Sequence, residues 1–257
     1  YYADVVDNAG NSFIDPTADS SQPFPYFYAW NSAINIVEPE DGDIVSGKFN
    51  IDIIENLHNT DYLEVSVAPS GSSTWYSLTG VSGATTRLDD PLSQVSGPTG
   101  DVVANKWRAS WDTATYVPAA SEGVWFIKVE AYDISPHKTG QDIIRVTVDN
   151  TPPEVSIEPI SDCLTGIVEF TAHATDQTTG ITEVFWQYEA SGSGVWKALR
   201  KDNVSGQTVT SVIDFDTSTI SDGHYTFKAT AYDEAGWSAS ATTQVVVIDN
   251  TAPEVEI

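Results

Sequence analysis

The sequence predicts an all-β protein made of tandem antiparallel β-sandwiches that are arranged as an extended rod. Three observations carry this prediction. Segments of the chain repeat at a spacing of about 100 residues, apolar and polar side chains alternate within the repeats, and proline-containing linkers without Gly/Ser-rich stretches join the repeats. A period of two is typical of strands with one buried face, and about 100 residues per unit is typical of a sandwich. No segment combines a helical period with capping residues.

The internal repeat is clearest in the second half of each unit. Gly123–Asp133 and Gly223–Asp233 both begin with Gly and end with Ala-Tyr-Asp, at an offset of 100 residues. Val148–Val155 and Ile248–Val255 follow at the same offset and share the pattern Asp-Asn-Thr-x-Pro-Glu-Val. Self-similarity at a fixed offset indicates structural units that follow one another along the chain.

This repeat predicts the domain boundaries. Residues 31–149 and 150–249 are expected to form two complete units, with residues 1–30 as the remnant of a preceding unit and a connecting segment, and residues 250–257 as the first strand of a further unit. The first unit is longer because it carries an inserted loop at about residues 79–106. That stretch is rich in Gly, Ser, Thr and Asp, which are residues typical of loops.

Alternation inside the repeated segments predicts the strands. Trp125, Ile127 and Val129 alternate with Phe126 and Lys128, and the same pattern recurs 100 residues later. Since successive side chains of a strand point to opposite faces, we expect one face of these strands to enter a core and the other to face water.

Several short motifs support a family resemblance. They are Pro-Glu-Asp-Gly with Val-Ser-Gly within residues 39–47, Trp-Asp-Thr at 111–113, Asp-Gly-x-Tyr at 222–225, Ala-Tyr-Asp-Glu-Ala-Gly at 231–236 and Asp-Asn-Thr-Ala-Pro at 249–253. Together they resemble the tandem immunoglobulin-like (fibronectin-III-like) repeats of prokaryotic secreted or cell-surface proteins. The resemblance covers about Ile34–Ile257 and implies immunoglobulin-like sandwiches, a fold that serves many functions.

Charge and hydropathy exclude several classes of partner. The chain has 11 Lys and Arg against 37 Asp and Glu, which gives a formal net charge of −26. Binding to nucleic acid needs clustered basic residues, so we expect no nucleic-acid partner. No apolar run approaches the roughly 20 residues of a membrane span, so we expect no membrane insertion in this segment. An acidic surface of this kind suits high salt or divalent cations.

No catalytic constellation is visible, and we expect that the protein is not an enzyme. The sequence lacks a nucleophile elbow, a P-loop and a dinucleotide fingerprint. The single cysteine, Cys163, is expected to be a partly buried small apolar residue, with an intermolecular disulfide as the alternative. The sequon Asn203-Val-Ser205 makes Asn203 a candidate glycosylation site in a turn-like stretch.

The sharpest site prediction is a calcium site formed by Asp149, Asp176 and Asp233. In an immunoglobulin-like unit the chain enters at the end where the B–C and F–G loops also lie, and in the second unit these three places carry the three aspartates. Calcium takes about six to eight oxygen ligands, which clustered carboxylates and backbone carbonyls supply. The alternative is a set of solvated turn residues, because Asp favours turns. The corresponding residues of the first unit, less regularly placed, are Asp133 with Glu55 or Asp61.

Aromatic residues form a second group of candidates. Pro23–Trp30 holds five aromatic residues in eight, and we expect a strand that packs against the first unit or a preceding domain. The alternative is a patch that binds sugar or protein. Trp75 and Trp196 occupy equivalent repeat positions, which favours a shared packing role.

The linkers predict the mechanics. Proline fixes φ and restricts the residue before it, so Thr151-Pro152-Pro153 is expected to be extended and stiff. Each sandwich should then add roughly 35–45 Å to a rod.

These features together indicate a non-catalytic structural or adhesive spacer of an extracellular or cell-surface protein, in a stalk, sheath or S-layer-like array, with calcium stiffening its domain junctions. The main alternative is a set of accessory C-terminal modules of a secreted peptidase or glycoside hydrolase. A third is a carbohydrate-binding module that uses Trp30, Trp75 or Trp196. The expected partners are neighbouring repeats of the same chain, other surface proteins and glycans.

Overall fold

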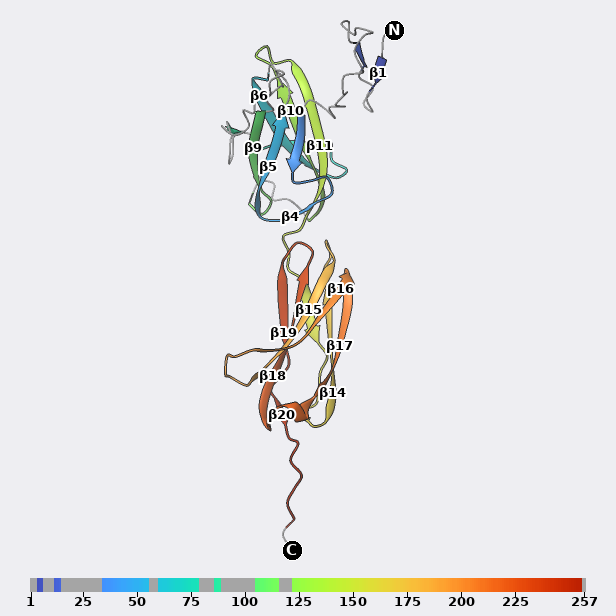
Figure 1. Cartoon of the computed structure of the whole chain (residues 1–257), viewed down its shortest axis with the longest axis vertical. Helices are drawn as coiled ribbons and strands as arrows, with labels where there is room; N and C mark the ends of the chain where they lie inside the picture. The colour runs from blue at the N-terminus through green and yellow to red at the C-terminus, as the bar shows by residue number, and fades with distance from the viewer. Residues whose placement is uncertain are drawn as a thin grey trace, which may run out of the picture.

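The structure is a computed structural model that describes residues 4–6, 12–14, 34–55, 60–78, 86–88, 105–115 and 122–255. The regular elements of these residues are all strands, apart from one short 3-10 helix at Thr217–Thr219. The strands form two sandwiches that lie end to end along the long axis of the molecule (Figure 1). The prediction of tandem immunoglobulin-like sandwiches in an extended arrangement is confirmed. No helix within the described ranges is long and apolar enough to cross a bilayer.

The first sandwich consists of two facing sheets. One sheet has the spatial order β3 (Ile34–Glu38), β5 (Lys48–Glu55), β9 (Asn105–Asp112), β8 (Thr86–Leu88). The other has the order β4 (Ile44–Val45), β11 (Lys138–Val148), β10 (Gly123–Tyr132), β6 (Tyr62–Pro69), β7 (Tyr76–Ser77). All described strand pairs of this sandwich are antiparallel except β4 with β11, which is parallel. A separate antiparallel pair precedes the sandwich: β1 (Asp4–Val6) and β2 (Ser12–Ile14).

The second sandwich repeats this order. One sheet has the order β12 (Glu154–Ile157), β14 (Ile167–Thr175), β17 (Thr208–Asp216). The other has the order β13 (Cys163–Leu164), β20 (Val246–Ile248), β18 (Gly223–Asp233), β15 (Ile181–Ala190), β16 (Lys197–Gly206), with β19 (Ser238–Thr242) also paired to β18. In immunoglobulin-like terms, strand B is β5 or β14, strand C is β6 or β15, strand F is β10 or β18, and the last strand is β11 or β19 with β20.

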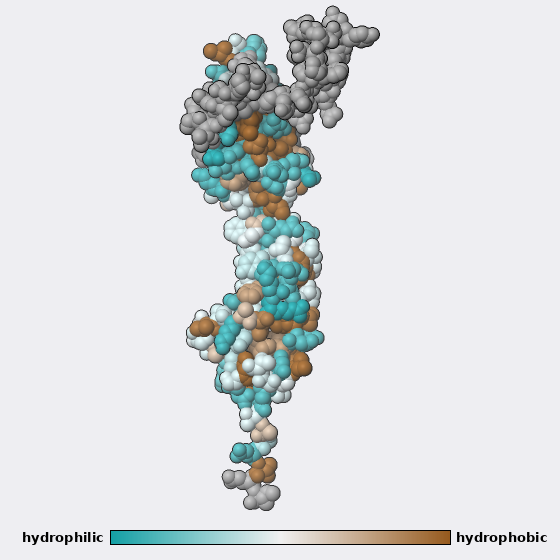
Figure 2. All heavy atoms as spheres, in the orientation of Figure 1, coloured by the Kyte–Doolittle hydropathy of each residue, from teal (hydrophilic) through white to brown (hydrophobic). Residues whose placement is uncertain are grey.

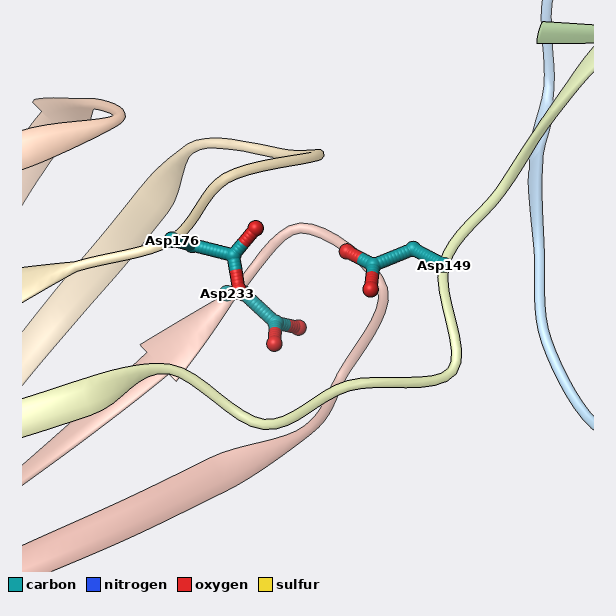
Figure 3. Close-up of side chains that lie close together, drawn as sticks. All are labelled: Asp149, Asp176 and Asp233. Carbon is teal, nitrogen blue, oxygen red and sulfur yellow. The ribbon is translucent and has the colours of Figure 1, made fainter. Parts of the chain in front are cut away.

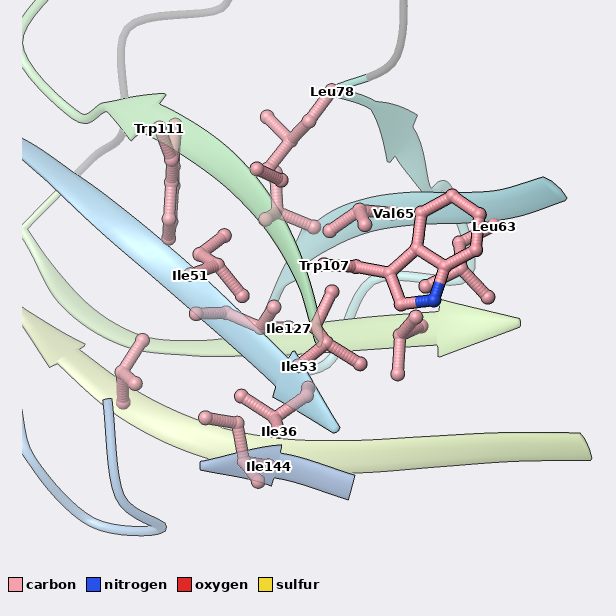
Figure 4. Close-up of a cluster of buried hydrophobic side chains, with 14 of the residues drawn as sticks. Ile36, Ile51, Ile53, Leu63, Val65, Leu78, Trp107, Trp111, Ile127 and Ile144 are labelled. Carbon is pink, nitrogen blue, oxygen red and sulfur yellow. The ribbon is translucent and has the colours of Figure 1, made fainter. Parts of the chain in front are cut away.

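Period-two alternation builds each core as predicted. Along β10, Trp125, Ile127, Val129 and Ala131 are at most 3 % exposed, and the residues between them are half-buried. The core of the first sandwich gathers isoleucine, valine and tryptophan side chains from both of its sheets (Figure 4). The core of the second sandwich is a separate cluster that shares no residue with the first. Each sandwich therefore has a hydrophobic core of its own.

The loop predicted at about residues 79–106 contains strand structure. Thr86–Leu88 form β8, which pairs with β9, and β9 itself begins at Asn105. The predicted loop therefore ends two residues too late. Trp107, Ala109 and Trp111 alternate into the core, and the strand that they form begins at Asn105, inside the predicted loop. The remainder of the predicted loop lies outside the described residues.

Trp75 and Trp196 occupy the same place in the two sandwiches. Lys128 Nζ on β10 lies 4.5 Å from the ring centroid of Trp75, and Lys228 Nζ on β18 lies 4.1 Å from that of Trp196. A cation over an indole face contributes about 0.5–1 kcal/mol at an exposed site. Each ring covers the lysine of strand F, which supports the shared packing role expected from the repeat.

The surface of the described residues is mixed in character along both sandwiches (Figure 2). On the face in Figure 2, hydrophilic residues are spread over both sandwiches, and the sandwiches meet at a narrow waist. The chain passes this waist once, through the linker that follows β11. The geometry of this crossing decides how the two sandwiches are held relative to each other.

Candidate metal centre

Three aspartates from three separate elements meet at the waist between the sandwiches. Asp149 follows β11, Asp176 follows β14, and Asp233 is the last residue of β18. Each offers a carboxylate oxygen that lies within 4.8 Å of the others, and all three residues are buried. Figure 3 shows the side chains pointing toward one another from the linker and from the two loops of the second sandwich. The convergence expected from the positions of the B–C and F–G loops is present.

Asp149 belongs to the linker but is bound on both sides. Its N–H donates to the carbonyl of Val45 in the first sandwich at 3.1 Å. Its Oδ1 accepts from the N–H of Thr151 at 3.2 Å, and its Oδ2 accepts from Thr179 Oγ1 of the second sandwich at 2.5 Å. The carboxylate is therefore oriented into the second sandwich by contacts that it makes with both.

Asp176 is held by a tight turn between β14 and β15. Its Oδ1 accepts hydrogen bonds from the N–H groups of Thr178 and Thr179, both at 2.8 Å. This local bonding is what makes aspartate common in turns. It fixes one carboxylate oxygen and leaves the second directed toward the other two aspartates (Figure 3).

Asp233 provides the observation that a turn alone does not explain. Its Oδ1 accepts from the N–H of Trp237 at 2.8 Å, but its Oδ2 is buried without any hydrogen-bond partner. The residue is only 4 % exposed. A buried carboxylate oxygen without a partner is costly, and burial of charge is tolerated when the group is paired, protonated or bound to a metal. Burial raises the pKa of Asp233, and the neighbouring Asp149 and Asp176 raise it further.

No basic side chain of the described chain forms an ion pair with any of the three aspartates. The ligand set is entirely oxygen, which suits the hard cations calcium, magnesium and manganese rather than zinc or copper. Calcium accepts irregular geometry and completes its shell with waters and backbone carbonyls, whereas magnesium demands a near-ideal octahedron. The three carboxylates therefore form a group that could hold a hard cation.

Glu122 is a fourth carboxylate, from the first sandwich, that the sequence analysis missed. Its two carboxylate oxygens accept from the N–H of Asn150 at 3.1 and 3.0 Å. Desolvation of the carboxylate raises the pKa of Glu122, and the charges of Asp149 and Asp176 act in the same direction. A signal was available, because Asp222 occupies the position 100 residues later, before the same glycine.

Trp237 is a second residue that the sequence analysis missed. Its Nε1–H donates to the carbonyl oxygen of Asp149 at 3.0 Å, so the F–G loop of the second sandwich holds the linker directly. His137 stands at the equivalent position of the first sandwich, so no repeat pattern marked this tryptophan.

The first sandwich does not assemble the corresponding site from the residues considered for it. Asp133 accepts from the N–H groups of Ser135 and His137, and its Oδ2 lies 3.4 Å from His137 Nδ1. These bonds lower the pKa of Asp133, with the N–H of His137 as the largest cause. Glu55 is buried and accepts from Thr60 Oγ1 at 3.0 Å. Among the described residues, the only such acidic group is that of the second sandwich.

The remaining sequence candidates fall in different places. Asn203 is exposed on the edge strand β16 and not in a turn, so the turn-like environment expected for it is wrong. Cys163 is exposed, not partly buried, because the short strand β13 turns Leu164 inward and Cys163 outward. The aromatic segment Pro23–Trp30 lies outside the described residues.

The fold and this site together define the class of protein: tandem immunoglobulin-like, fibronectin-III-like modules with an acidic centre between them. No family model matches the sequence, and no curated protein matches it.

Solved structures resemble the fold at low identity. The fibronectin(III)-like modules of Clostridium thermocellum CbhA are 13 % identical with a TM-score of 0.41, over 87 % of this chain and 98 % of that chain. The D00-D0 domain of intimin is 14 % identical with a TM-score of 0.33, over 85 % of this chain and 100 % of that chain. The FN1–FN3 domains of chicken CNTN1 are 13 % identical with a TM-score of 0.37, over 82 % of this chain and 65 % of that chain.

The acidic centre predicts a pH dependence in the absence of metal. Because the pKa of Asp233 is raised in the folded state, the folded protein keeps a proton that the unfolded chain releases. The protonated Asp233 makes its full contribution to the free energy of unfolding below the pKa of the aspartate in the unfolded chain, which is about 4. This contribution is lost as the pH rises through the higher pKa that Asp233 has in the folded protein. In EDTA, we therefore expect Asp233→Asn to gain stability relative to the wild type as the pH rises from about 4 to about 7. Denaturant titrations across this range measure the difference.

Asp133→Asn is the matched control, because Asp133 holds the same repeat position with a lowered pKa. Its carboxylate stabilises the folded state above the unfolded pKa and loses this effect as the pH falls. Asp133→Asn should therefore lose stability relative to the wild type as the pH rises. If the difference in free energy of unfolding between Asp233→Asn and the wild type stays constant with pH, the raised pKa assigned to Asp233 in the acidic centre is contradicted.

Proposed function

We propose that the protein is a non-catalytic structural or adhesive spacer of an extracellular or cell-surface protein, of the kind found in stalks, sheaths or S-layer-like arrays, and that calcium at Asp149, Asp176 and Asp233 stiffens its domain junction. The observation that carries the proposal is the linker, which is hydrogen-bonded to the sandwich on each side of it.

On the side of the first sandwich, the linker is held by a set of contacts that we call the linker cradle: Gly47, Thr113 and Asn150. Asn150 Oδ1 accepts from the N–H of Gly47 at 2.9 Å and from Thr113 Oγ1 at 2.8 Å. Thr113 also donates its N–H to the carbonyl of Gly47 at 2.8 Å, and its Oγ1 lies 3.0 Å from the same oxygen, so its single hydroxyl proton is shared between this carbonyl and Asn150 Oδ1. A linker bonded in this way has few accessible conformations, which suits a spacer that must keep a fixed length.

On the side of the second sandwich, the linker is held by Thr179 and Trp237, which bind the side chain and the carbonyl of Asp149. A cation at the centre would add bonds between Asp149, from the linker, and the two loop aspartates of the second sandwich. The net charge of −26 supports this role, since a divalent cation removes part of the repulsion that an acidic rod carries.

Small-angle X-ray scattering in CaCl2 and in EDTA tests the proposal. With calcium, we expect an elongated particle with a maximum dimension of about 80 Å or more and a distance distribution with a distinct second maximum. EDTA should blur that second maximum, because the junction bends. Asn150→Ala, which opens the linker cradle, should blur it even with calcium, whereas the control Asn203→Ala on the exposed edge of β16 should leave it unchanged.

Two outcomes count against the proposal. A maximum dimension near 50–60 Å, which corresponds roughly to two units folded against each other, would refute the spacer. Identical profiles in CaCl2 and EDTA would refute the role of calcium in stiffening the junction.

A further inference from the structure

One pair of cross-strand neighbours differs in chemical kind between the two sandwiches. In the first sandwich, Val67 on β6 lies opposite Tyr76 on β7; Val67 is buried and Tyr76 packs against the core. The equivalent pair in the second sandwich is Tyr188 on β15 opposite Lys197 on β16, where Tyr188 is half-buried and Lys197 is exposed. A place that core side chains fill in the first sandwich therefore carries an aromatic ring and an ammonium group in the second.

This pair opens onto a cavity of about 540 Å³ at the edge of the second sandwich. One wall is the hairpin of residues 191–196, which joins β15 to β16 and projects from the side of the sandwich (Figure 1). The other wall is the turn of residues 219–221, between the 3-10 helix and β18. Cavities that bind small molecules usually measure about 300–1,000 Å³, so this one has the size of a ligand site.

The apolar part of the cavity consists mainly of two tyrosine rings. The centroids of Tyr188 and Tyr225 lie 6.1 Å apart with the ring planes tilted by 53°, and the ring of Tyr188 also lies 6.1 Å from that of Phe227 in the core. Contact with the core fixes the position of the Tyr188 ring. Aromatic rings of this kind offer a flat apolar surface, which is what the C–H face of a sugar ring contacts.

The polar part of the cavity is dominated by hydroxyl groups. Five of its nine lining residues carry one: Tyr188, Ser193, Thr219, Ser221 and Tyr225. A hydroxyl group can both donate and accept hydrogen bonds, and so can each hydroxyl group of a sugar. This composition favours a sugar over a purely apolar ligand.

Lys197 provides the only cationic group of the cavity. Its Nζ lies 5.8 Å from the ring centroid of Tyr188, and it forms no ion pair with any described residue. The other two basic residues of the same strand, Arg200 and Lys201, are paired with carboxylates of the chain. An ammonium group without a carboxylate partner, on the rim of a cavity, is available to bind an anionic group of a ligand.

Hydrogen bonds hold the walls of the cavity in place. In the hairpin, the N–H of Gly194 donates to Glu189 Oε2 at 2.7 Å, and the N–H of Ser191 donates to the carbonyl of His224 on β18 at 2.8 Å. On the opposite side, Tyr225 Oη donates to the carbonyl of Ser221 at 2.8 Å. A cavity whose walls are already ordered loses little conformational entropy when a ligand binds.

We propose that this cavity binds an acidic glycan through a sugar that carries a carboxylate, such as a uronic acid. The sugar ring lies on the ring of Tyr188, and its carboxylate binds the ammonium group of Lys197. Its hydroxyl groups form hydrogen bonds with the side chains of Ser193 and Ser221.

The cavity is separate from the other candidate sites. Trp196, considered from the sequence as a sugar-binding residue, covers Lys228 on the outer face of the sheet, whereas Tyr188 and Lys197 lie on its inner face. The aspartates of the candidate metal centre lie at the waist, where β15 begins, and Tyr188 lies near the other end of that strand. The proposed glycan site therefore does not depend on the calcium junction.

Isothermal titration of the chain with tetragalacturonate, with its methyl ester and with acetate tests the inference. The buffer contains EDTA, so that calcium plays no part, and about 0.15 M NaCl, which screens the repulsion between the acidic chain and the acidic sugar beyond about 8 Å. We expect saturable binding of one tetragalacturonate per chain. The methyl ester, which has the same rings without the charge, should bind roughly tenfold more weakly, because a charge-assisted hydrogen bond is lost.

Three variants assign the binding to the cavity. Lys197→Gln should lower the affinity for tetragalacturonate to that of the methyl ester and leave the affinity for the methyl ester unchanged. Lys201→Gln is the matched control, because it removes the same charge from the outer side of the same strand, and it should change neither affinity. Tyr188→Leu, which keeps an apolar side chain toward the core, should weaken both probes, and calorimetry verifies that the second sandwich of this variant still folds.

Four outcomes would overturn the inference. No saturable binding of tetragalacturonate would show that the cavity is not a glycan site. Equal affinities for the acid and its methyl ester, or for the wild type and Lys197→Gln, would refute the role of the ammonium group. Acetate that competes at the same concentration as tetragalacturonate would refute recognition of the sugar. Amide chemical shifts that change around Trp75 or Trp196 and not around the cavity would place the binding elsewhere. Since all measurements are made in EDTA, none of these outcomes bears on the proposed calcium junction.

Discussion

Replacing Asp233 by asparagine is expected to abolish the calcium response of the second sandwich and to stabilise the calcium-free protein. The substitution keeps the oxygen that accepts from the N–H of Trp237 and replaces the oxygen that lacks a partner by an amide donor, which faces Asp149 and Asp176. An ion that binds only the folded state adds about 2.7 kcal/mol at one hundred times its dissociation constant. For a domain of this size, that corresponds to a rise of roughly 10–20 °C in the melting temperature.

Differential scanning calorimetry in EDTA, in millimolar CaCl2 and in NaCl of matched ionic strength measures this effect. The wild type should gain stability with CaCl2 and not with NaCl, while Asp233→Asn should melt above the wild type in EDTA and ignore calcium. Asp133→Asn serves as the control, because it changes the same repeat position of the other sandwich. An equal rise with NaCl would assign the effect to general screening by salt instead of a specific site.

Replacing Phe170 by alanine is expected to unfold the second sandwich selectively. The Phe170 side chain is fully buried, and its ring lies 4.3 Å from that of Phe227 and 6.2 Å from that of Trp186, between centroids. Truncation of a buried phenylalanine costs about 3–5 kcal/mol, which lowers the melting temperature of this sandwich by more than about 10 °C. The transition of the first sandwich should stay in place, because the two cores share no residue.

Val212→Ala is the control for this prediction, because Val212 is 42 % exposed on the neighbouring strand β17. It should shift neither transition by more than about 2–4 °C, since exposed substitutions usually change stability by less than about 0.5 kcal/mol. If Phe170→Ala lowers both transitions together, the sandwiches are one cooperative unit, and the independence of their cores is refuted.

The fold could be predicted because strand patterns and repeats are properties of the sequence itself. The alternation around Ile127 fixed which side chains enter the core, and the known loop order of the sandwich placed Asp176 and Asp233 at one end of it. The prediction that Cys163 is partly buried was wrong for a local reason. Its strand, β13, has only two residues and is too short to show a period, so alternation could not indicate which way Cys163 points.

The contribution of Trp237 could not be predicted in the same way, whereas that of Glu122 could have been found from its repeat counterpart Asp222. Both act through the linker: Glu122 binds the N–H of Asn150, and Trp237 binds the carbonyl of Asp149. The contact of Trp237 depends on how one sandwich is oriented on the next, and a pattern within a single repeat does not encode that orientation.

The parallel pairing of the short strands β4 and β13 determines how the chain responds to tension. Each of them runs beside the last strand of its sandwich, and the N–H groups of Asp149 and Asp249 extend this pairing to the carbonyls of Val45 and Leu164. When the two ends of the chain are pulled apart, parallel neighbours are displaced along their length, so their hydrogen bonds are loaded together and not one after another. Resistance to forced unfolding is governed by the unfolding rate. Because these hydrogen bonds are loaded together, the shear geometry raises the barrier to unfolding at the start of each linker.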